Sequence, residues 1–133
     1  MHKGECNCGN VSYEVDKLLT GVVICHCSIC RRSTGSNGIA VVVANKSDFR
    51  WTKGRDNVTT WIKPEHDWQS SFCKTCGANL PGENDEVRMY IPAGSLIAPP
   101  EDLRVTHHIW TDSKACWDTI CDNGKQHKQA FEG

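Results

Sequence analysis

The stretch Cys73-Lys74-Thr75-Cys76-Gly77, together with Cys6-Asn7-Cys8-Gly9 near the N-terminus, decides the fold of this chain. Thiolates separated by one or two residues can point at one metal ion, and four of them close a tetrahedral zinc site. The turn that aims them commonly needs a positive φ after its last cysteine, which glycine adopts without penalty. We therefore predict a structural zinc ion that joins the start of the chain to its middle, bound by Cys6, Cys8, Cys73 and Cys76.

A third group of cysteines, Cys25-His26-Cys27-Ser28-Ile29-Cys30, supplies only three nearby thiolates. Its fourth ligand stays open between water, a substrate thiol, His26 and a distant histidine. A histidine between two ligating cysteines of an extended segment points away from the metal, so His26 is a poor ligand candidate. Zinc chemistry requires a free coordination position. We expect a second zinc ion on Cys25, Cys27 and Cys30 with that position open, and a second structural zinc with an unseen ligand is the alternative.

Three arginines can accompany this second site. Arg31 and Arg32 follow Cys30 directly, beside three negatively charged thiolates. They can balance that charge, bind the carboxylates of an anionic substrate, or lie on the surface as solvated charges. Arg104 is a further candidate for a carboxylate partner.

The cysteines favour metal binding over disulfides. The chain of 133 residues has nine cysteines, an odd number, and cysteines as close as Cys6 and Cys8 rarely form a good disulfide. The first residues contain no apolar core like that of a signal peptide, so we expect a cytoplasmic protein. The longest apolar runs, Gly21–Cys25 and Ile39–Ala44, are too short to cross a membrane. Near-balanced charge, 15 basic against 16 acidic residues, argues against a nucleic-acid partner.

Short β-rich segments bounded by glycine, asparagine or proline predict a mainly β fold. The length predicts a single domain over residues 1–133. Helix is expected only as one turn at Ser28–Ser33, another at Ser47–Phe49, and a short helix or turn at Ser113–Ile120. The tryptophans are expected to supply core volume, with one of them available to line a pocket. The predicted strands are Val11–Val15, Val22–Cys25, Ile39–Val43, Thr59–Ile62, Gln69–Cys73 and Val87–Ile91.

In this order, the motifs of the chain resemble those of the glutathione-dependent formaldehyde-activating family, which includes the centromere protein V domain. The chain departs from the family at Ile97, where an aspartate is common after Gly-x-Leu, and at Lys125, which replaces a frequent proline. The matching segments are Gly4–Val11, Cys25–Gly35, Phe72–Gly77, Gly94–Leu96 and His107–Trp110 with Trp117.

The resemblance implies a zinc-stabilised β-tent built of short antiparallel sheets with little helix. It implies two zinc ions on the same cysteines, the one on Cys25, Cys27 and Cys30 being catalytic in type. It also implies a carbon–sulfur lyase that joins glutathione, as co-substrate, to formaldehyde and gives S-hydroxymethylglutathione. The partners would be a small-molecule thiol and a small aldehyde. The alternative function is a non-catalytic, double-zinc interaction module.

Four other residues have less specific patterns. Cys116 and Cys121 are expected to pack in the core rather than form a site. His107 and His108 lie in an apparent strand and therefore face opposite sides. A surface position is expected for them, and a polar network or an approach to the second zinc is the alternative.

Overall fold

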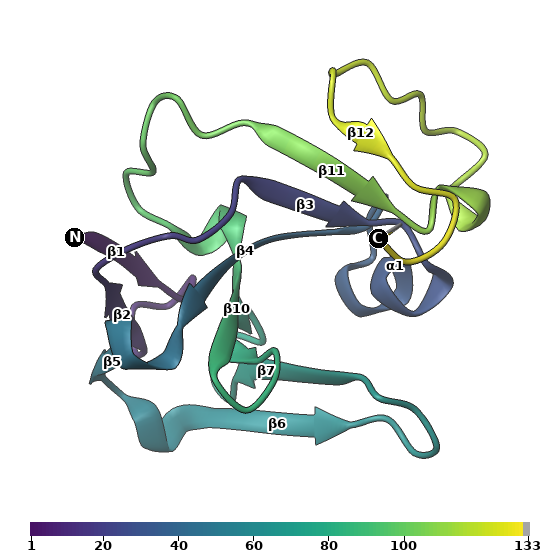
Figure 1. Ribbon diagram of the computed structural model, residues 1–133. Helices are drawn as coiled ribbons and strands as arrows, with labels where there is room; N and C mark the ends of the chain where they lie inside the picture. The colour runs from purple at the N-terminus through teal and green to yellow at the C-terminus, as the bar shows by residue number, and fades with distance from the viewer. Residues whose placement is uncertain (132–133) are drawn as a thin grey trace.

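In the computed structural model, which describes residues 1–131, the strands form three small sheets (Figure 1). The last two residues of the expected domain lie outside the described part. The first sheet has the order β1-β2-β5, the second β12-β11-β3-β4-β10-β9, and the third β6-β7-β8. The first consists of β1 (His2–Glu5), β2 (Ser12–Val15) and β5 (Phe49–Lys53). The third consists of β6 (Val58–Ile62), β7 (Gln69–Cys73) and β8 (Asn79–Leu80).

The six-stranded sheet lies between the other two, and its strands β3 and β4 connect the N-terminal third to the rest (Figure 1). Strand β11 pairs in parallel with both β3 and β12, so this sheet is mixed and not wholly antiparallel as expected. Its strands are β3 (Val22–Cys25), β4 (Ile39–Asn45), β9 (Gly82–Glu83), β10 (Arg88–Pro92), β11 (Val105–Ile109) and β12 (Lys125–Gln126).

Helix is scarce, as the sequence predicts. The single α-helix of the described residues, α1 (Ser28–Thr34), is capped by Cys27 and ends at Gly35 in the left-handed conformation. The segment predicted as a helix or turn at Ser113–Ile120 contains turns only, after a short 3₁₀ helix. The 3₁₀ helices are η1 (Lys46–Asp48), η2 (Arg55–Asn57), η3 (Ala93–Ser95) and η4 (Thr111–Ser113).

The main core fills the space between the first sheet and one face of the six-stranded sheet. Tyr13 is fully buried at its centre, where its ring stacks on Phe49 at 5.4 Å between centroids and its hydroxyl bonds to Ser95. A Cβ on Gly4 would lie 2.1 Å from the Tyr13 ring, so only glycine permits this close approach of β1. The other buried members are Val15, Val22, Val42, Ala44, Ile91 and Leu96.

A second, smaller core joins the first sheet to the third. Its buried members are Cys6, Val11, Cys73 and Leu80. Two of the four are cysteines from the segments that the sequence predicts to share a metal ion. The second core and the predicted metal ligands are therefore in the same place.

Both cysteine turns carry the glycine geometry that the sequence predicts. Gly9 has φ of 78° and Gly77 has φ of 74°. The amide of Gly9 donates to the carbonyl of Cys6 at 3.1 Å, and that of Gly77 to the carbonyl of Cys73 at 2.8 Å. A Cβ at either position would meet open space, so only backbone strain opposes a side chain there.

We predict that Gly77→Ala lowers the free energy of unfolding by about 1–2 kcal/mol, the cost of placing an L-residue in the left-handed region. Gly94→Ala is the matched control, since its Cβ also meets open space and its φ is not positive. Chemical denaturation of both variants measures the difference. Equal stability of the two would contradict the prediction.

Candidate metal centres

The N-terminal turn and the turn after β7 bring four thiols together. Their sulfur atoms all lie within 4.8 Å of one another. The Cys8 sulfur is 3.6 Å from that of Cys6 and 3.7 Å from that of Cys73, a residue 65 positions away in the chain. This group, which we call the four-cysteine cluster, consists of Cys6, Cys8, Cys73 and Cys76, as predicted.

Backbone and amide N–H groups surround the four-cysteine cluster. The Val11 amide donates to the Cys6 sulfur at 3.3 Å, and the Asn57 side chain donates to the Cys73 sulfur at 3.3 Å. Asn57 also bonds to the Thr75 hydroxyl at 3.0 Å, which fixes its orientation. Donors of this kind stabilise thiolates and orient them toward a cation. Sequence reasoning missed Asn57, because no motif links it to a cysteine 16 positions later.

The thiols of this cluster differ in acidity. Backbone donors at Cys76 and Thr75 lower the pKa of Cys73 to about 6. The Asn10 amide also lowers the pKa of Cys8, but burial and three neighbouring thiols outweigh it and raise that pKa to about 11. The four thiols cannot all ionise together without a compensating positive charge. A soft divalent cation fits this donor set, and four sulfurs complete a tetrahedral site.

The second group of thiols is built by a strand end and the helix after it. Cys25 is the last residue of β3, Cys27 caps α1, and Cys30 lies in its first turn. The Cys30 amide donates to the Cys27 sulfur at 3.3 Å. Among the described residues these three bring their sulfur atoms within 4.8 Å of one another, and we call them the three-cysteine cluster. Cys25 and Cys27 are half-buried and Cys30 is buried, so the cluster lies at the surface.

Within the three-cysteine cluster the thiols differ in acidity. The neighbouring Cys30 thiol and the backbone donor at Cys27 lower the pKa of Cys25 to about 6. The neighbouring Cys25 thiol, together with burial, raises the pKa of Cys30 far above its ordinary value. One thiolate therefore forms easily at neutral pH, and the others ionise only when a cation offsets their charge. The donor set fits a thiophilic metal and leaves one tetrahedral position without a protein sulfur.

His26 points away from the sulfur atoms, as predicted, into a buried histidine pair. Its Nε2 lies 2.8 Å from Nδ1 of His108, whose own Nε2 lies 2.8 Å from the carboxylate of Asp122. His26 and His108 are only 2 % and 1 % exposed. For His108 the polar network is therefore correct and the surface position is wrong. Burial and then the neighbouring His108 lower the pKa of His26, so its neutral form is favoured.

The three candidate arginines differ in their exposure and in their distance from the three-cysteine cluster. Arg32 is exposed on α1, whereas the Nε of the half-buried Arg31 forms no hydrogen bond within residues 1–131. Arg104 bonds to the carbonyls of Glu101 and Leu103. It precedes β11, whose other end pairs with Cys25, so a strand's length separates it from the three-cysteine cluster.

The expectation that Cys116 and Cys121 pack in the core is wrong, because both are exposed. The buried residue of their segment is Ala115, and the chain around it forms turns without a strand or helix to carry the cysteines inward. The tryptophans also differ from expectation. Trp51 packs against both cores, but Trp61 and Trp117 are 50 % and 68 % exposed.

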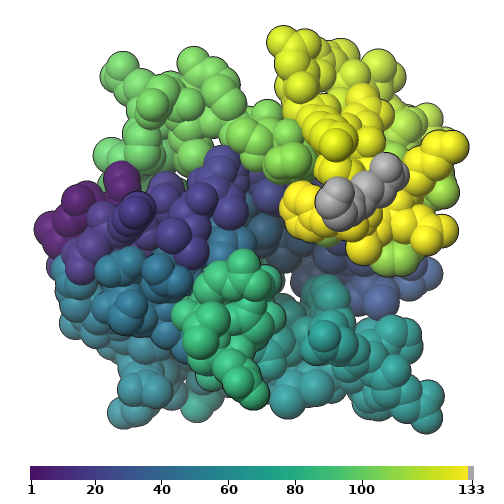
Figure 2. All heavy atoms as spheres, in the orientation of Figure 1, coloured from purple at the N-terminus to yellow at the C-terminus, as the bar shows by residue number. Residues whose placement is uncertain are grey.

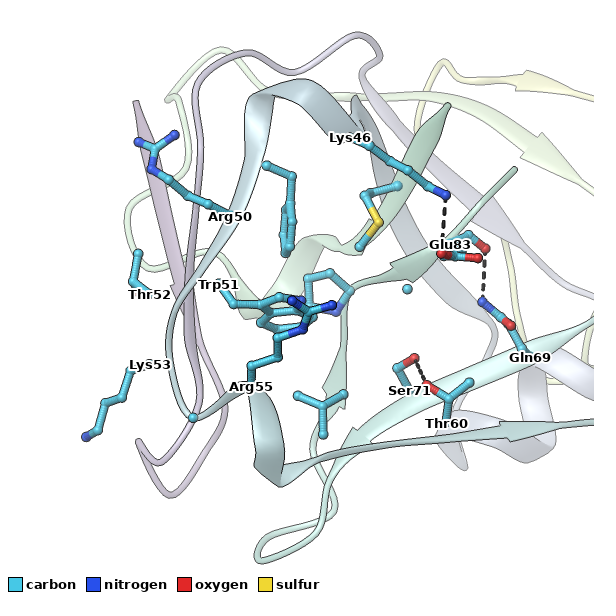
Figure 3. A pocket seen from close by; sticks show the side chains of 16 residues that line it. Lys46, Arg50, Trp51, Thr52, Lys53, Arg55, Thr60, Gln69, Ser71 and Glu83 are labelled. Carbon is cyan, nitrogen blue, oxygen red and sulfur yellow. Dashed lines mark hydrogen bonds and ion pairs between the residues drawn. The ribbon is translucent and has the colours of Figure 1, made fainter. Parts of the chain in front are cut away.

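A cavity of about 940 Å³ lies away from α1 against β5, β6 and β7 (Figure 3). Trp51 and Arg55 both line it, and the Lys46–Glu83 ion pair of 3.2 Å lies at one side. Neither cysteine cluster lines it. No helix of the described residues is long and apolar enough to cross a membrane.

A mainly β fold with two clusters of closely spaced thiols, each able to hold a metal ion, defines the class of this domain. The chain belongs to the glutathione-dependent formaldehyde-activating enzyme family, whose model matches residues 1–113. The matched region contains both clusters and β11, which carries His108.

Individual relatives agree with this assignment. The chain is 27 % identical over 143 aligned positions to a Halomonas elongata protein named "Putative glutathione-dependent formaldehyde-activating enzyme". That alignment covers 98 % of this chain and 87 % of the relative. A crystal structure of a Rhodobacter sphaeroides protein superimposes with a TM-score of 0.61 at 29 % identity, covering 74 % of this chain and 91 % of the other.

We predict that Cys73→Ser lowers the metal content of the purified protein by one ion and lowers Tm by more than about 10 °C. Metal binding free energy is folding free energy at such a site. Cys121→Ser is the matched control, because Cys121 is exposed and belongs to neither cluster. Elemental analysis and thermal unfolding check both variants. Full metal content and an unchanged Tm of Cys73→Ser would contradict the assignment of Cys73 as a metal ligand.

A second prediction concerns acid stability. His108 and the Gly124 amide donate to Asp122, which holds the pKa of that carboxyl below its usual range. A pKa lowered by folding adds stability above the unfolded pKa and loses it as the pH falls through the folded pKa. We expect the Tm of the wild-type protein to be higher than that of Asp122→Asn at pH 7. This difference in Tm should shrink below a pH of about 4. A difference that stays constant down to pH 3 would refute this.

Proposed function

We propose that the chain binds two zinc ions and joins glutathione to formaldehyde, giving S-hydroxymethylglutathione as a carbon–sulfur lyase. Family membership supports the reactants. The observation that carries the division of roles is the difference between the clusters, since four sulfurs fill a tetrahedral site and three leave a position for a substrate. The four-cysteine cluster is then structural, and the three-cysteine cluster is the reactive site.

The proposed reaction is an addition without any oxidant. The glutathione sulfur attacks the carbonyl carbon of formaldehyde, a carbon–sulfur bond forms, and the carbonyl π electrons move to oxygen. That oxygen takes up one proton, equal to the proton that the thiol released. Zinc held by Cys25, Cys27 and Cys30 would supply a Lewis acid that favours the thiolate at neutral pH.

The residues of the chain prepare this site in three ways. The Cys30 amide donates to the Cys27 sulfur, and all three sulfur atoms lie within 4.8 Å of one another before any substrate arrives. The His26–His108 pair fixes the backbone between Cys25 and Cys27, since both rings are buried and bonded. Arg31 and Arg32 supply positive charge for the glutathione carboxylates, and Arg32 is the more accessible of the two.

We further propose that residues 1–133 act as one domain in the cytoplasm. Seven of the nine cysteines gather in two clusters able to hold metal ions, and such thiols persist in a reducing compartment. Glutathione is abundant where thiols stay reduced, which agrees with the proposed co-substrate.

We predict that Cys27→Ser abolishes glutathione-dependent consumption of formaldehyde while Tm falls far less than in Cys73→Ser. Cys27 serves the three-cysteine cluster, and the four-cysteine cluster that joins two sheets stays complete. Cys116→Ser, an exposed cysteine outside both clusters, should behave like the wild type.

Calorimetry with glutathione and the rate of formaldehyde loss with and without glutathione test the proposal directly. Wild-type protein with two bound zinc ions that neither binds glutathione nor changes the rate would refute it. Two inert, four-coordinate zinc ions in that protein would instead indicate the non-catalytic interaction module.

A further inference from the structure

A groove of about 470 Å³ separates α1 from the β6–β7 hairpin. The hairpin projects below α1, and the two lie next to each other at the right of the molecule (Figures 1 and 2). One wall is helical and the other is formed by the hairpin and the start of β8. The residues that matter here are Ile29, Arg32 and Ser33 of the helix with Trp61, Lys63 and Trp68 of the hairpin.

Two tryptophans make the hairpin wall aromatic and apolar. The rings of Trp61 and Trp68 meet edge to face, with centroids 6.4 Å apart and planes at 67°. Trp61 is half exposed, and its neighbours Thr60 and Ile62 on β6 are exposed as well. An aromatic ring face left open in a groove binds planar groups such as amides and rings.

The groove adjoins the three-cysteine cluster. Ser33, in the groove wall, follows Cys30 by three positions on α1, which places their Cβ atoms about 5–6 Å apart. Ser33 and Trp68 also line a small cavity that reaches Ile39, and Ile39 is the antiparallel partner of Cys25. None of the three cysteines lines the groove, but its helical wall lies within one turn of Cys30 on α1, so the three-cysteine cluster lies behind that wall.

The charges around Trp68 differ on its two sides. The groove contains two charged residues, Arg32 and Lys63, which are both positive and form no ion pair within residues 1–131. The Lys63 ammonium lies 6.0 Å from the centre of the Trp61 ring. The cavity on the other side of Trp68 is mostly acidic, lined by Asp67, Glu83, Asp85 and Glu86. An anionic ligand is therefore drawn to the α1 side.

We propose that this groove binds the non-reacting part of the thiol substrate. Its flat amide or aromatic portion lies on Trp61 and Trp68, and its carboxylate pairs with Arg32 and Lys63, which directs the sulfur toward the three-cysteine cluster. This inference rests on the proposed function and adds the residues that select its thiol. They favour thiols that carry a planar group and a carboxylate several bonds from the sulfur. Glutathione fits this description, whereas cysteine and 2-mercaptoethanol are too small to fill the groove.

S-Methylglutathione is the probe, because it keeps the peptide and both carboxylates but has no free thiol. We expect it to bind wild-type protein in calorimetry. Trp61→Ala and Arg32→Gln should each weaken its Kd about 5–10-fold, as the loss of one aromatic or charged contact does. Their metal content should be unchanged, since neither residue is a cysteine ligand.

Matched controls lie elsewhere on the surface. Trp117→Ala removes an exposed indole that does not line the groove, and Arg55→Gln removes a guanidinium from the cavity of about 940 Å³. Both should bind S-methylglutathione like the wild type. If circular dichroism shows that Trp61→Ala is unfolded, Lys63→Gln replaces it, because Lys63 lines the same groove and its ammonium lies 6.0 Å from the centre of the Trp61 ring.

The outcomes separate this inference from the proposed function. The proposal that the groove binds the thiol substrate would be overturned by wild-type protein that fails to bind S-methylglutathione. Groove variants that bind it as well as the controls do would also overturn it. Glutathione-dependent formaldehyde consumption could persist in either case and would keep the proposed function. Weakened binding in the groove variants alone supports the groove, even if no formaldehyde is consumed.

Discussion

The meeting of Cys6 and Cys8 with Cys73 and Cys76 is the constraint on which the rest of the structure depends. Cys6 and Cys73 are buried in the small core that joins the first sheet to the third, Cys76 packs against it, and Cys8 is exposed at its edge. A core of four buried residues is small, and so ligand bonds at this point would contribute more than apolar burial does. The position of the β6–β7 hairpin, and with it the groove beside α1, follows from this junction.

The six-stranded sheet connects this junction to the three-cysteine cluster. One face of β4 buries Val42 and Ala44 against the first sheet, while the other face carries Ile39 toward the hairpin. The same strand pairs Ile39 with Cys25. The three-cysteine cluster is therefore held by the central strands, whereas the groove wall opposite is held by the third sheet. A change at the four-cysteine cluster that moved the β6–β7 hairpin would therefore alter the groove without contacting a sulfur of the three-cysteine cluster.

Sequence reasoning was most accurate where side-chain chemistry acts locally. Val22–Cys25 and Gln69–Cys73 were predicted with the bounds that β3 and β7 have, because their apolar or β-prone runs end at cysteine turns. Strand β1 was missed, since His2–Glu5 has no apolar pattern and is a strand only through its pairing with β2. The His108–Asp122 bond was equally invisible, because tertiary pairing of β11 with β3 decides which histidine turns inward.

The two clusters differ in how far along the chain their members lie, and this has a consequence for biosynthesis. Cys25, Cys27 and Cys30 fall within one strand end and one helical turn, so closing them costs little chain entropy. Cys8 and Cys73 are 65 positions apart, and their loop cannot close until Cys76 has left the ribosome. A nascent chain thus presents the three-cysteine cluster as a ready chelating group long before the four-cysteine cluster can form. Under the proposed function, metal ions would enter this protein in a fixed order, at the three-cysteine cluster first and at the four-cysteine cluster after it.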